Sequence, residues 1–366
     1  MDAARRHHLC LMLILVTGAS GFAGSRLIPR LISDGHRVRA LARDPARVDT
    51  TEIMSHFLDP HARAHVCTRA DGHADQDTLE VFTGDALTGK GLARTMHGVE
   101  VAYYLIHSME RTPPRPDVVG GRATPFPERE RIAAENFAAA AARAGVRRLV
   151  YLGGPTASWT AARDAVEEDA VLSPHLSSRE AVERILRDAI PDTVVLRASI
   201  VIGARSRSFR FLVRLVERMP VLALPAWHIH RTRPIDARDV IDMLAAAATV
   251  AAAAGRSLDV GGPDILSYGE MIRRIADLML LARPAVGLGV SVTPLTARVA
   301  AAIADEDPEL VSALMESLQG DLLPGGPDGS SHLRAAAALG IDLHSFDSAV
   351  EHALREWESV EKLAAR

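Results

Sequence analysis

The chain has 366 residues, of which 48% are hydrophobic and 24% charged, with a formal net charge of −4 and a mean hydropathy of +0.07. This is the composition of an ordinary soluble globular protein, and it gives no electrostatic footprint for nucleic-acid binding, so we expect no nucleic-acid partner. No apolar run reaches the roughly 20 residues that span a bilayer. The only two cysteines, Cys10 and Cys67, exclude a disulfide framework and favour a cytoplasmic location.

Apolar runs typical of strands alternate with helix-period segments through the first half of the chain. The run 9–16 follows two arginines but is short for a signal core and leads into a glycine motif, so we interpret it as a buried strand. Strands are predicted at 11–17, 37–42, 81–84, 99–105, 148–152 and 193–197, and helices at 21–34, 128–144 and 177–189. This alternation predicts an α/β fold, a Rossmann-type doubly wound parallel sheet covered on both faces.

Beyond residue 199 the pattern becomes irregular. A helix is predicted at 208–218, strands at 231–235 and 258–260, and several helices after them. We expect the sheet domain to cover 11–205, with 230–256 returning to it. A smaller, interleaved C-terminal lobe is expected at 206–229 and 257–350, and 351–366 form the end of the last helix.

A glycine-rich motif joins the first predicted strand to the first helix, with the sequence VTGASGFAG at 16–24. Gly18 permits a tight turn, Gly21 lets the backbone approach a pyrophosphate, and Gly24 lets the helix lie close to the sheet. The amides at the helix N-terminus favour negative charge. We therefore expect Gly18, Ser20, Gly21, Phe22 and Gly24 to bind a dinucleotide. The alternative is that the glycines serve only the turn and helix packing.

The end of the second strand indicates which dinucleotide is bound. An acidic residue at this place would hold the adenosine ribose of NAD. The sequence has two arginines here, Arg39 and Arg43, and the acidic Asp44 directly after Arg43. Arg43 favours a 2′-phosphate, so NADP(H) is the preferred cofactor, while Asp44 leaves NAD(H) open. Asp85 and Ala86, after the third strand, are expected to contact the adenine. The alternative for Asp85 is a loop cap.

Together with further segments, these motifs carry a family resemblance. The further segments are GD at 84–85, YLIHSM at 104–109, LRASIVIG at 196–203, PIDARDV at 234–240 and GGP at 261–263. The chain resembles an atypical extended short-chain dehydrogenase/reductase, similar to the NAD(P)H-binding group that includes relatives of a complex I subunit and the NmrA-like proteins. The resemblance implies a Rossmann fold and a nicotinamide cofactor, but it indicates no particular substrate.

The catalytic pattern of these reductases is missing. The family uses a Ser, a Tyr and a Lys four residues after the Tyr, whereas the only lysines here are Lys90 and Lys362. At the matching place stand His175 and Arg179, and two glycines replace the serine. An imidazole exchanges protons near neutral pH, so His175 is the candidate proton donor, with Arg179 orienting it or binding the ribose and an anionic substrate. The alternative is that His175 is only a polar residue at the start of a helix and that Arg179 is only a solvated cation.

Two other residues could face the nicotinamide. His107 lies at the end of the fourth strand and is a second catalytic candidate, and Ser199 follows the sixth strand and is assigned to cofactor binding. The alternative is that His107 and Ser199 have only a structural role, which is more common for a single histidine or serine at such a position.

Two further segments were considered for ligands. Residues 224–233 include Trp227 and His228 and lie where the second lobe of an extended reductase closes over the cofactor, which suits an aromatic or quinone-like substrate. An ordinary surface loop is the alternative. A second cluster comprises His56, His61, His65, Cys67 and His73. Its spacings match no closed zinc pattern, so we expect no metal.

The sequence supports two functions. The first is an NADPH-dependent reductase of a small carbonyl, enone or quinone-like compound, with the proton supplied by His175 or water. The second is an NAD(P)H-binding sensor or assembly protein without turnover, which the missing Ser-Tyr-Lys set favours. The large second lobe favours the enzyme.

Overall fold

The computed structural model describes residues 11–50, 53, 66–67, 78–106, 118–119, 122–123, 125–156, 159, 174–288, 293–305, 308, 311–312, 315, 318, 320–324 and 330–359. Within this part of the chain eight strands form one sheet in which every neighbouring pair is parallel. Their order is β14 (Ser257–Asp259), β9 (Val194–Arg197), β8 (Arg148–Gly153), β5 (Val101–Tyr104), β1 (Leu13–Thr17), β2 (Arg37–Ala42), β4 (Leu79–Thr83) and β3 (Val66–Cys67). The predicted parallel α/β sheet is confirmed.

The central strands are buried on both faces. In β1, Ile14 and Val16 pack into one hydrophobic cluster while Leu15 packs into another, because successive side chains of a strand point to opposite faces. A continuous apolar run is therefore what this position in the sheet requires.

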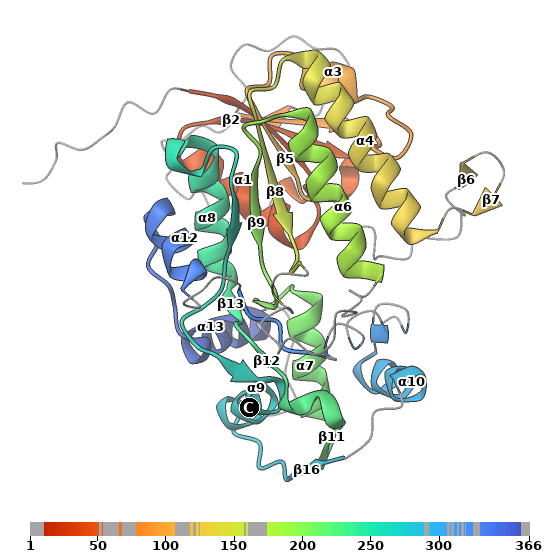
Figure 1. The fold of residues 1–366 in the computed structure, drawn as a ribbon, viewed down its shortest axis with the longest axis vertical. Coiled ribbons are helices and arrows are strands. Elements are labelled where there is room, and N and C mark those ends of the chain that lie inside the picture. The colour runs from red at the N-terminus through yellow and green to blue at the C-terminus, as the bar shows by residue number, and fades with distance from the viewer. Residues whose placement is uncertain are drawn as a thin grey trace, which may run out of the picture.

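Helices cover the two faces of this sheet (Figure 1). One face carries α1 (Phe22–Ser33), α8 (Ala237–Thr249) and α12 (Ser331–Leu339), and the other carries α3 (Leu92–Met96), α4 (Phe126–Ala144) and α6 (Pro174–Ala189). The long helix α4 ends at Gly145, whose φ of +71° is a left-handed conformation that favours glycine. This layering places the carboxyl ends of all the parallel strands at one edge.

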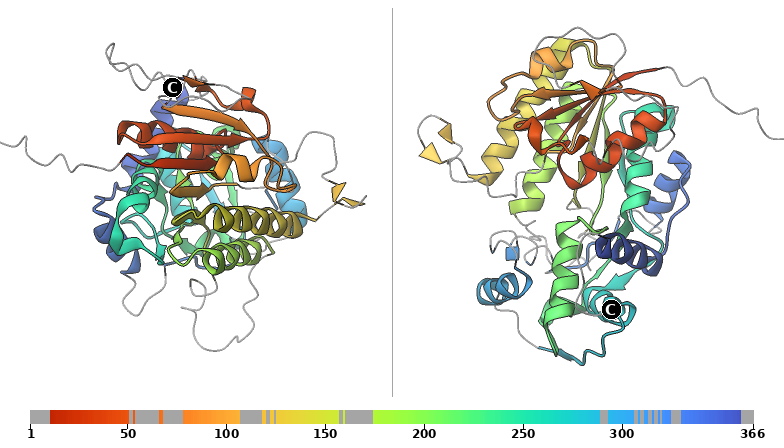
Figure 2. Two further views of the ribbon diagram at one scale, coloured as in Figure 1. Left: turned by 90° about the horizontal axis from the view of Figure 1, so that it is seen from above. Right: turned by 180° about the vertical axis from the view of Figure 1, so that it is seen from behind.

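The smaller lobe lies beyond that edge and has its own hydrophobic core (Figure 2, right). Its helices are α7 (Arg207–Arg218), α9 (Tyr268–Leu278), α10 (Thr293–Ala304) and α13 (Phe346–Glu358). Short strand pairs flank them: β10 (Val201–Ile202) with β13 (Ile235–Asp236), β11 (Leu222–Leu224) with β16 (Ala285–Gly287), and β12 (Arg231–Thr232) with β15 (Leu266–Ser267). The remaining elements are the hairpin β6 (Val118–Val119) and β7 (Arg122–Ala123), and the 3₁₀ turns η1 (Pro45–Arg47), η2 (Ala226–Ile229) and η3 (Ala251–Ala253).

Two predictions differ from the structure. The strand predicted at 231–235 is divided into β12 and β13, which pair with different partners, and Pro234 between them has no N–H to continue a ladder. The predicted boundaries place 257–259 and 331–339 in the smaller lobe, whereas β14 pairs with β9 at the edge of the main sheet and α12 packs on a face of that sheet. The other domain boundaries stay a prediction.

Candidate functional site

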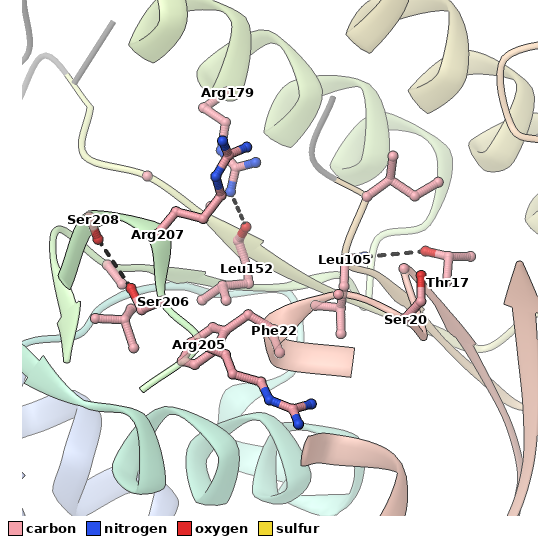
Figure 3. A pocket seen from close by; sticks show the side chains of 18 of the residues that line it. Thr17, Ser20, Phe22, Leu105, Leu152, Arg179, Arg205, Ser206, Arg207 and Ser208 are labelled. Atoms are coloured by element: carbon pink, nitrogen blue, oxygen red, sulfur yellow. Dashed lines mark hydrogen bonds between the residues drawn. The ribbon is translucent and has the colours of Figure 1, made fainter. Parts of the chain in front are cut away.

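A cavity of about 1070 Å³ lies at the carboxyl ends of the sheet strands, and the smaller lobe contributes its other wall (Figure 3). Crevices at this edge of an open α/β sheet are where ligands bind. Of the predicted site residues, ten line it: Gly18, Ser20, Gly21, Phe22, Arg43, Asp85, Ala86, His175, Arg179 and Ser199. The fold thus brings most of the predicted residues to one place.

The glycine-rich turn has the geometry that the motif predicts. Gly18 has a φ of +67°, and a Cβ there would lie 2.5 Å from the carbonyl oxygen of Leu105. A Cβ on Gly24 would lie 2.3 Å from the carbonyl oxygen of Gly18, so α1 packs directly on the turn. Gly24, which was also expected to bind the dinucleotide, is not among the lining residues, so the structure supports only its packing role.

The N-terminus of α1 is suited to a pyrophosphate. Its N-cap residue is Gly21, no side chain caps it, and the first turn contains no acidic residue. The leading amides of a helix point outward and favour an anion. Ser20 and Phe22 line the cavity on either side of Gly21. These features fit the dinucleotide that the sequence predicts.

Two arginines stand at the end of β2. Arg43 and Arg47 are exposed, line the cavity, and form no ion pair within the described part of the chain. Arg39, also considered from the sequence, is instead held by Glu80, with 2.6 Å between its Nε and a carboxylate oxygen. Asp44 accepts a hydrogen bond from the amide of Ala46 at 3.1 Å and so caps η1. Arg43 and Arg47 are thus better placed than the carboxylate of Asp44 to contact a ligand.

The loop after β4, which was expected to contact the adenine, lines the cavity. Asp85 accepts hydrogen bonds from the amide of Leu87 at 3.0 Å and the hydroxyl of Thr88 at 3.3 Å. These are the contacts of a loop cap, the alternative considered for Asp85. The side-chain amide of Asn136 on α4 donates to the carbonyl oxygens of Ala86 and Leu87, which fixes the loop against the helix.

His175 and Arg179 lie one turn apart at the start of α6. The guanidinium of Arg179 donates a hydrogen bond to the carbonyl oxygen of Leu152 and lies 5.2 Å from the ring centroid of Tyr151 (Figure 3). Burial, and then the charge of Arg179, lower the pKa of His175 to about 4. The imidazole is therefore neutral at pH 7, and the expectation of a donor that exchanges its proton near neutral pH is wrong for the free protein.

The other two candidates differ in what surrounds them. His107 lies outside the described residues; Leu105 and Ile106 before it line the cavity. Ser199 donates a hydrogen bond to the carbonyl oxygen of Arg233 and accepts one from the hydroxyl of Thr232, both at 3.0 Å. Ser199 thus links the end of β9 to the smaller lobe.

The tyrosines do not replace the missing phenol. All four are buried, and burial raises the pKa of Tyr103, Tyr104, Tyr151 and Tyr268. Only Tyr268 is among the residues that line the cavity. A phenol that is harder to ionise than in water is a poor partner for proton exchange.

The segment 224–233 does not form the substrate wall that was expected. Trp227 is buried in the core of the smaller lobe, edge-on to Tyr268 at 6.1 Å between ring centroids. The ring of His228 contacts the carbonyl oxygen of Pro225 at 2.9 Å. Neither residue lines the cavity. Leu224 and Trp227 pack into the core of the smaller lobe, whereas Ile229 and Arg231 are exposed.

The residues that line the cavity from the smaller lobe were not predicted from the sequence. Arg205, Arg207 and Arg210 come from the start of α7 and the turn before it. Three arginines within six residues after a short strand were the available signal, but the segment was interpreted only as a helix.

Metal binding and membrane spanning find no support in the described residues. They contain no group of three or more His, Cys, Asp or Glu side chains able to hold a metal ion. His56, His61, His65 and His73 lie outside them, and Cys67 lies in β3. None of the helices described is both long and apolar enough to cross a bilayer.

Comparisons with known proteins agree with this geometry. A model of the NAD(P)H-binding family matches residues 18–211. The chain is 47% identical to dihydroflavonol 4-reductase of Dianthus caryophyllus over 64 residues, which are 17% of each chain. It is 27% identical to ceramide reductase of Caulobacter vibrioides over 210 residues, which are 57% of this chain and 52% of the ceramide reductase. The matches thus span less than two thirds of these relatives.

The fold is also similar to solved structures. UDP-glucuronic acid 4-epimerase of Bacillus cereus, in complex with NAD, superposes with a TM-score of 0.62 at 18% identity, covering 96% of this chain and 97% of the epimerase. At this identity the likeness shows the fold alone.

Proposed function

We propose that this chain, which belongs to the NAD(P)H-binding family, is an NADPH-dependent reductase of a small carbonyl, enone or quinone-like compound. One observation carries the proposal: a cavity at the carboxyl edge of the sheet is lined at once by the glycine turn, by Arg43 and by His175. A dinucleotide and a second, smaller reactant would meet at this edge.

The residues assigned to the cofactor follow the cavity along the sheet edge. The turn at Gly18 and the amides after Gly21 would hold the pyrophosphate. Arg43 and Arg47 would bind the 2′-phosphate, which supports NADP(H) over NAD(H). Ser199 would lie beside the nicotinamide. When bound, the reduced cofactor supplies the hydride.

His175 would act on the substrate oxygen as a neutral hydrogen-bond donor. Its pKa of about 4 means that few imidazolium ions exist at pH 7. A neutral imidazole with a lowered pKa can still polarise a carbonyl through its N–H, as in triosephosphate isomerase. Because it keeps its own proton, water would supply the proton that the product oxygen gains.

Arg179 would be a positioning residue. Its guanidinium is held by the Leu152 carbonyl and lies over the Tyr151 ring, so its charge stands at a fixed place one turn from His175. Burial, and then this charge, lower the pKa of His175 and favour the neutral imidazole.

Binding without turnover is the second candidate function. The observation that favours it is the burial of all four tyrosines, whose raised pKa values leave no phenol of ordinary acidity in the described chain. In that case the protein would report or store the cofactor without reducing a substrate.

Calorimetric titration with NADPH and NADH, followed by an optical screen of ketones, enones and quinones for NADPH oxidation, tests both candidates. A reductase binds NADPH more tightly than NADH and oxidises it with at least one compound. Tight binding of NADPH with no turnover across the screen would support the binding protein, and no binding of either dinucleotide would reject both.

A further inference from the structure

The wall that the smaller lobe contributes to the cavity is partly cationic and partly apolar. Arg207 and Arg210 come from the first turn of α7, and Phe211 and Leu212 follow on the same helix. Leu318 and Leu322 extend the apolar part. Such a wall suits a ligand that has an apolar body and a polar group at one end.

The charges that line the cavity are unevenly distributed. Its only carboxylates among the described lining residues are Asp44 and Asp85, and both lie at the adenosine end. None of the described residues that line the cavity from the smaller lobe is an Asp or Glu. A cleft lined by one sign of charge attracts ligands of the opposite sign.

Arg210 differs from its neighbour Arg214 in a way that points to a ligand. Both guanidinium groups lie over the ring of Trp357, at 5.3 and 5.1 Å from its centroid. Arg214 is paired with Glu217 at 2.6 Å. Arg210 has no ion pair in the described part of the chain, and its Nε is buried without a hydrogen-bond partner there. A partly buried cation without a counter-charge is costly, and an anionic ligand would offset that cost.

We propose that the substrate is a carbonyl compound with an apolar body and a carboxylate remote from the carbonyl. Arg207 and Arg210 bind the carboxylate, and Phe211, Leu212, Leu318 and Leu322 contact the apolar body. This substrate class rests on the proposed reductase function. It replaces the flat aromatic ring that the segment 224–233 suggested, because that segment does not line the cavity.

A matched pair of probes tests the charge alone. The ketone 7-oxooctanoate and its methyl ester differ in the remote carboxylate and have the same reacting carbonyl. Each is titrated calorimetrically into protein saturated with NADP⁺, a complex in which no reduction can occur. We expect the carboxylate to bind at least about tenfold more tightly than the ester, which corresponds to one good charge-assisted contact.

Variants locate the contact. Arg210→Leu and Arg207→Leu should each remove most of the preference for the carboxylate, and Arg210→Lys should keep part of it. Arg214→Leu is the matched control, since it removes the same charge from the same helix and the same aromatic ring, and it should keep the full preference. NADP⁺ affinity and thermal unfolding, measured on each variant, show that the fold and the cofactor site are intact.

The two proposals fail in different ways. If wild-type protein does not bind NADP⁺, the reductase function fails and the substrate class fails with it. If NADP⁺ binds but the carboxylate has no advantage over the ester, including the case in which neither binds, only the substrate class is overturned. A preference that persists unchanged in Arg207→Leu and Arg210→Leu overturns it as well.

Discussion

The two walls of the cavity are built differently. The sheet side contains a backbone wall, formed by the glycine turn and the first amides of α1, whose geometry is fixed by close contacts such as that of Gly18 with the Leu105 carbonyl. The smaller-lobe side is made of long side chains on α7, such as Arg207 and Arg210. A backbone wall can hold a constant ligand, whereas a side-chain wall can be changed residue by residue to suit a substrate.

The largest effect is expected from filling the backbone wall. Gly21→Val places a branched side chain at the N-cap of α1, where a Cβ alone would lie 3.1 Å from the Gly18 carbonyl oxygen. NADPH binding should fall by at least about 100-fold, because the pyrophosphate loses its close approach to the amides. Calorimetric titration measures this. Gly35→Ala, at the other end of α1, has open space but a φ of +89° that strains a side chain, so it controls for lost stability and should bind NADPH normally. Unchanged binding in Gly21→Val would mean that the ligand is held elsewhere.

Removing the imidazole should affect chemistry and leave cofactor binding nearly unchanged. His175→Phe should lower kcat by about 10²- to 10³-fold, the usual loss when one preorganised donor is removed. With a pKa of about 4, the wild-type imidazole stays neutral from pH 6 to 8, so its protonation adds no slope to kcat there. A kcat that rises about tenfold for each pH unit lowered would instead identify the imidazolium as the donor. Steady-state kinetics at several pH values distinguish the neutral imidazole from the imidazolium as the donor.

The arginine at the end of β2 should discriminate between the two dinucleotides. Arg43→Ala should weaken NADPH binding by about 10- to 100-fold, the range for a lost charge-assisted contact, and change NADH binding little. Arg39→Ala is the control, because its guanidinium is held by Glu80 away from the cavity. Equal losses for NADPH and NADH in Arg43→Ala would contradict the 2′-phosphate assignment.

The last effect concerns stability in acid. The folded state holds the pKa of His175 at about 4, below the roughly 6.5 of an unfolded chain. Between these values the unfolded state binds more protons, so the free energy of unfolding falls as the pH is lowered through this window. The loss should reach roughly 3 kcal/mol near pH 4.

Urea unfolding of wild type and His175→Gln at pH 7 and pH 4.5 measures this difference. The variant should lose less stability than wild type on acidification. Equal losses in the two proteins would show that the site does not depress the pKa of this histidine.

The difference between the walls also explains what could be predicted from sequence. The turn at 18–24 is local, since a glycine pattern between a strand and a helix fixes its own geometry, and the alternation of strands and helices fixes the parallel sheet. The wall on α7 depends on how a second lobe packs against the first. Nothing in the local pattern showed that Trp227 would be buried while Arg207 and Arg210 would line the cavity. The lowered pKa of His175 likewise arises from burial and from Arg179, which only the assembled fold reveals.

A crystal structure of the NADP⁺ complex tests the central claim most directly, namely that one cavity holds the cofactor along the backbone wall and leaves the substrate between His175 and α7. The account predicts the pyrophosphate at the N-terminus of α1, the 2′-phosphate within hydrogen-bond reach of Arg43, about 2.7 to 2.9 Å, and the nicotinamide facing His175. A dinucleotide bound with its nicotinamide away from His175, or with its 2′-phosphate in solvent, would contradict it.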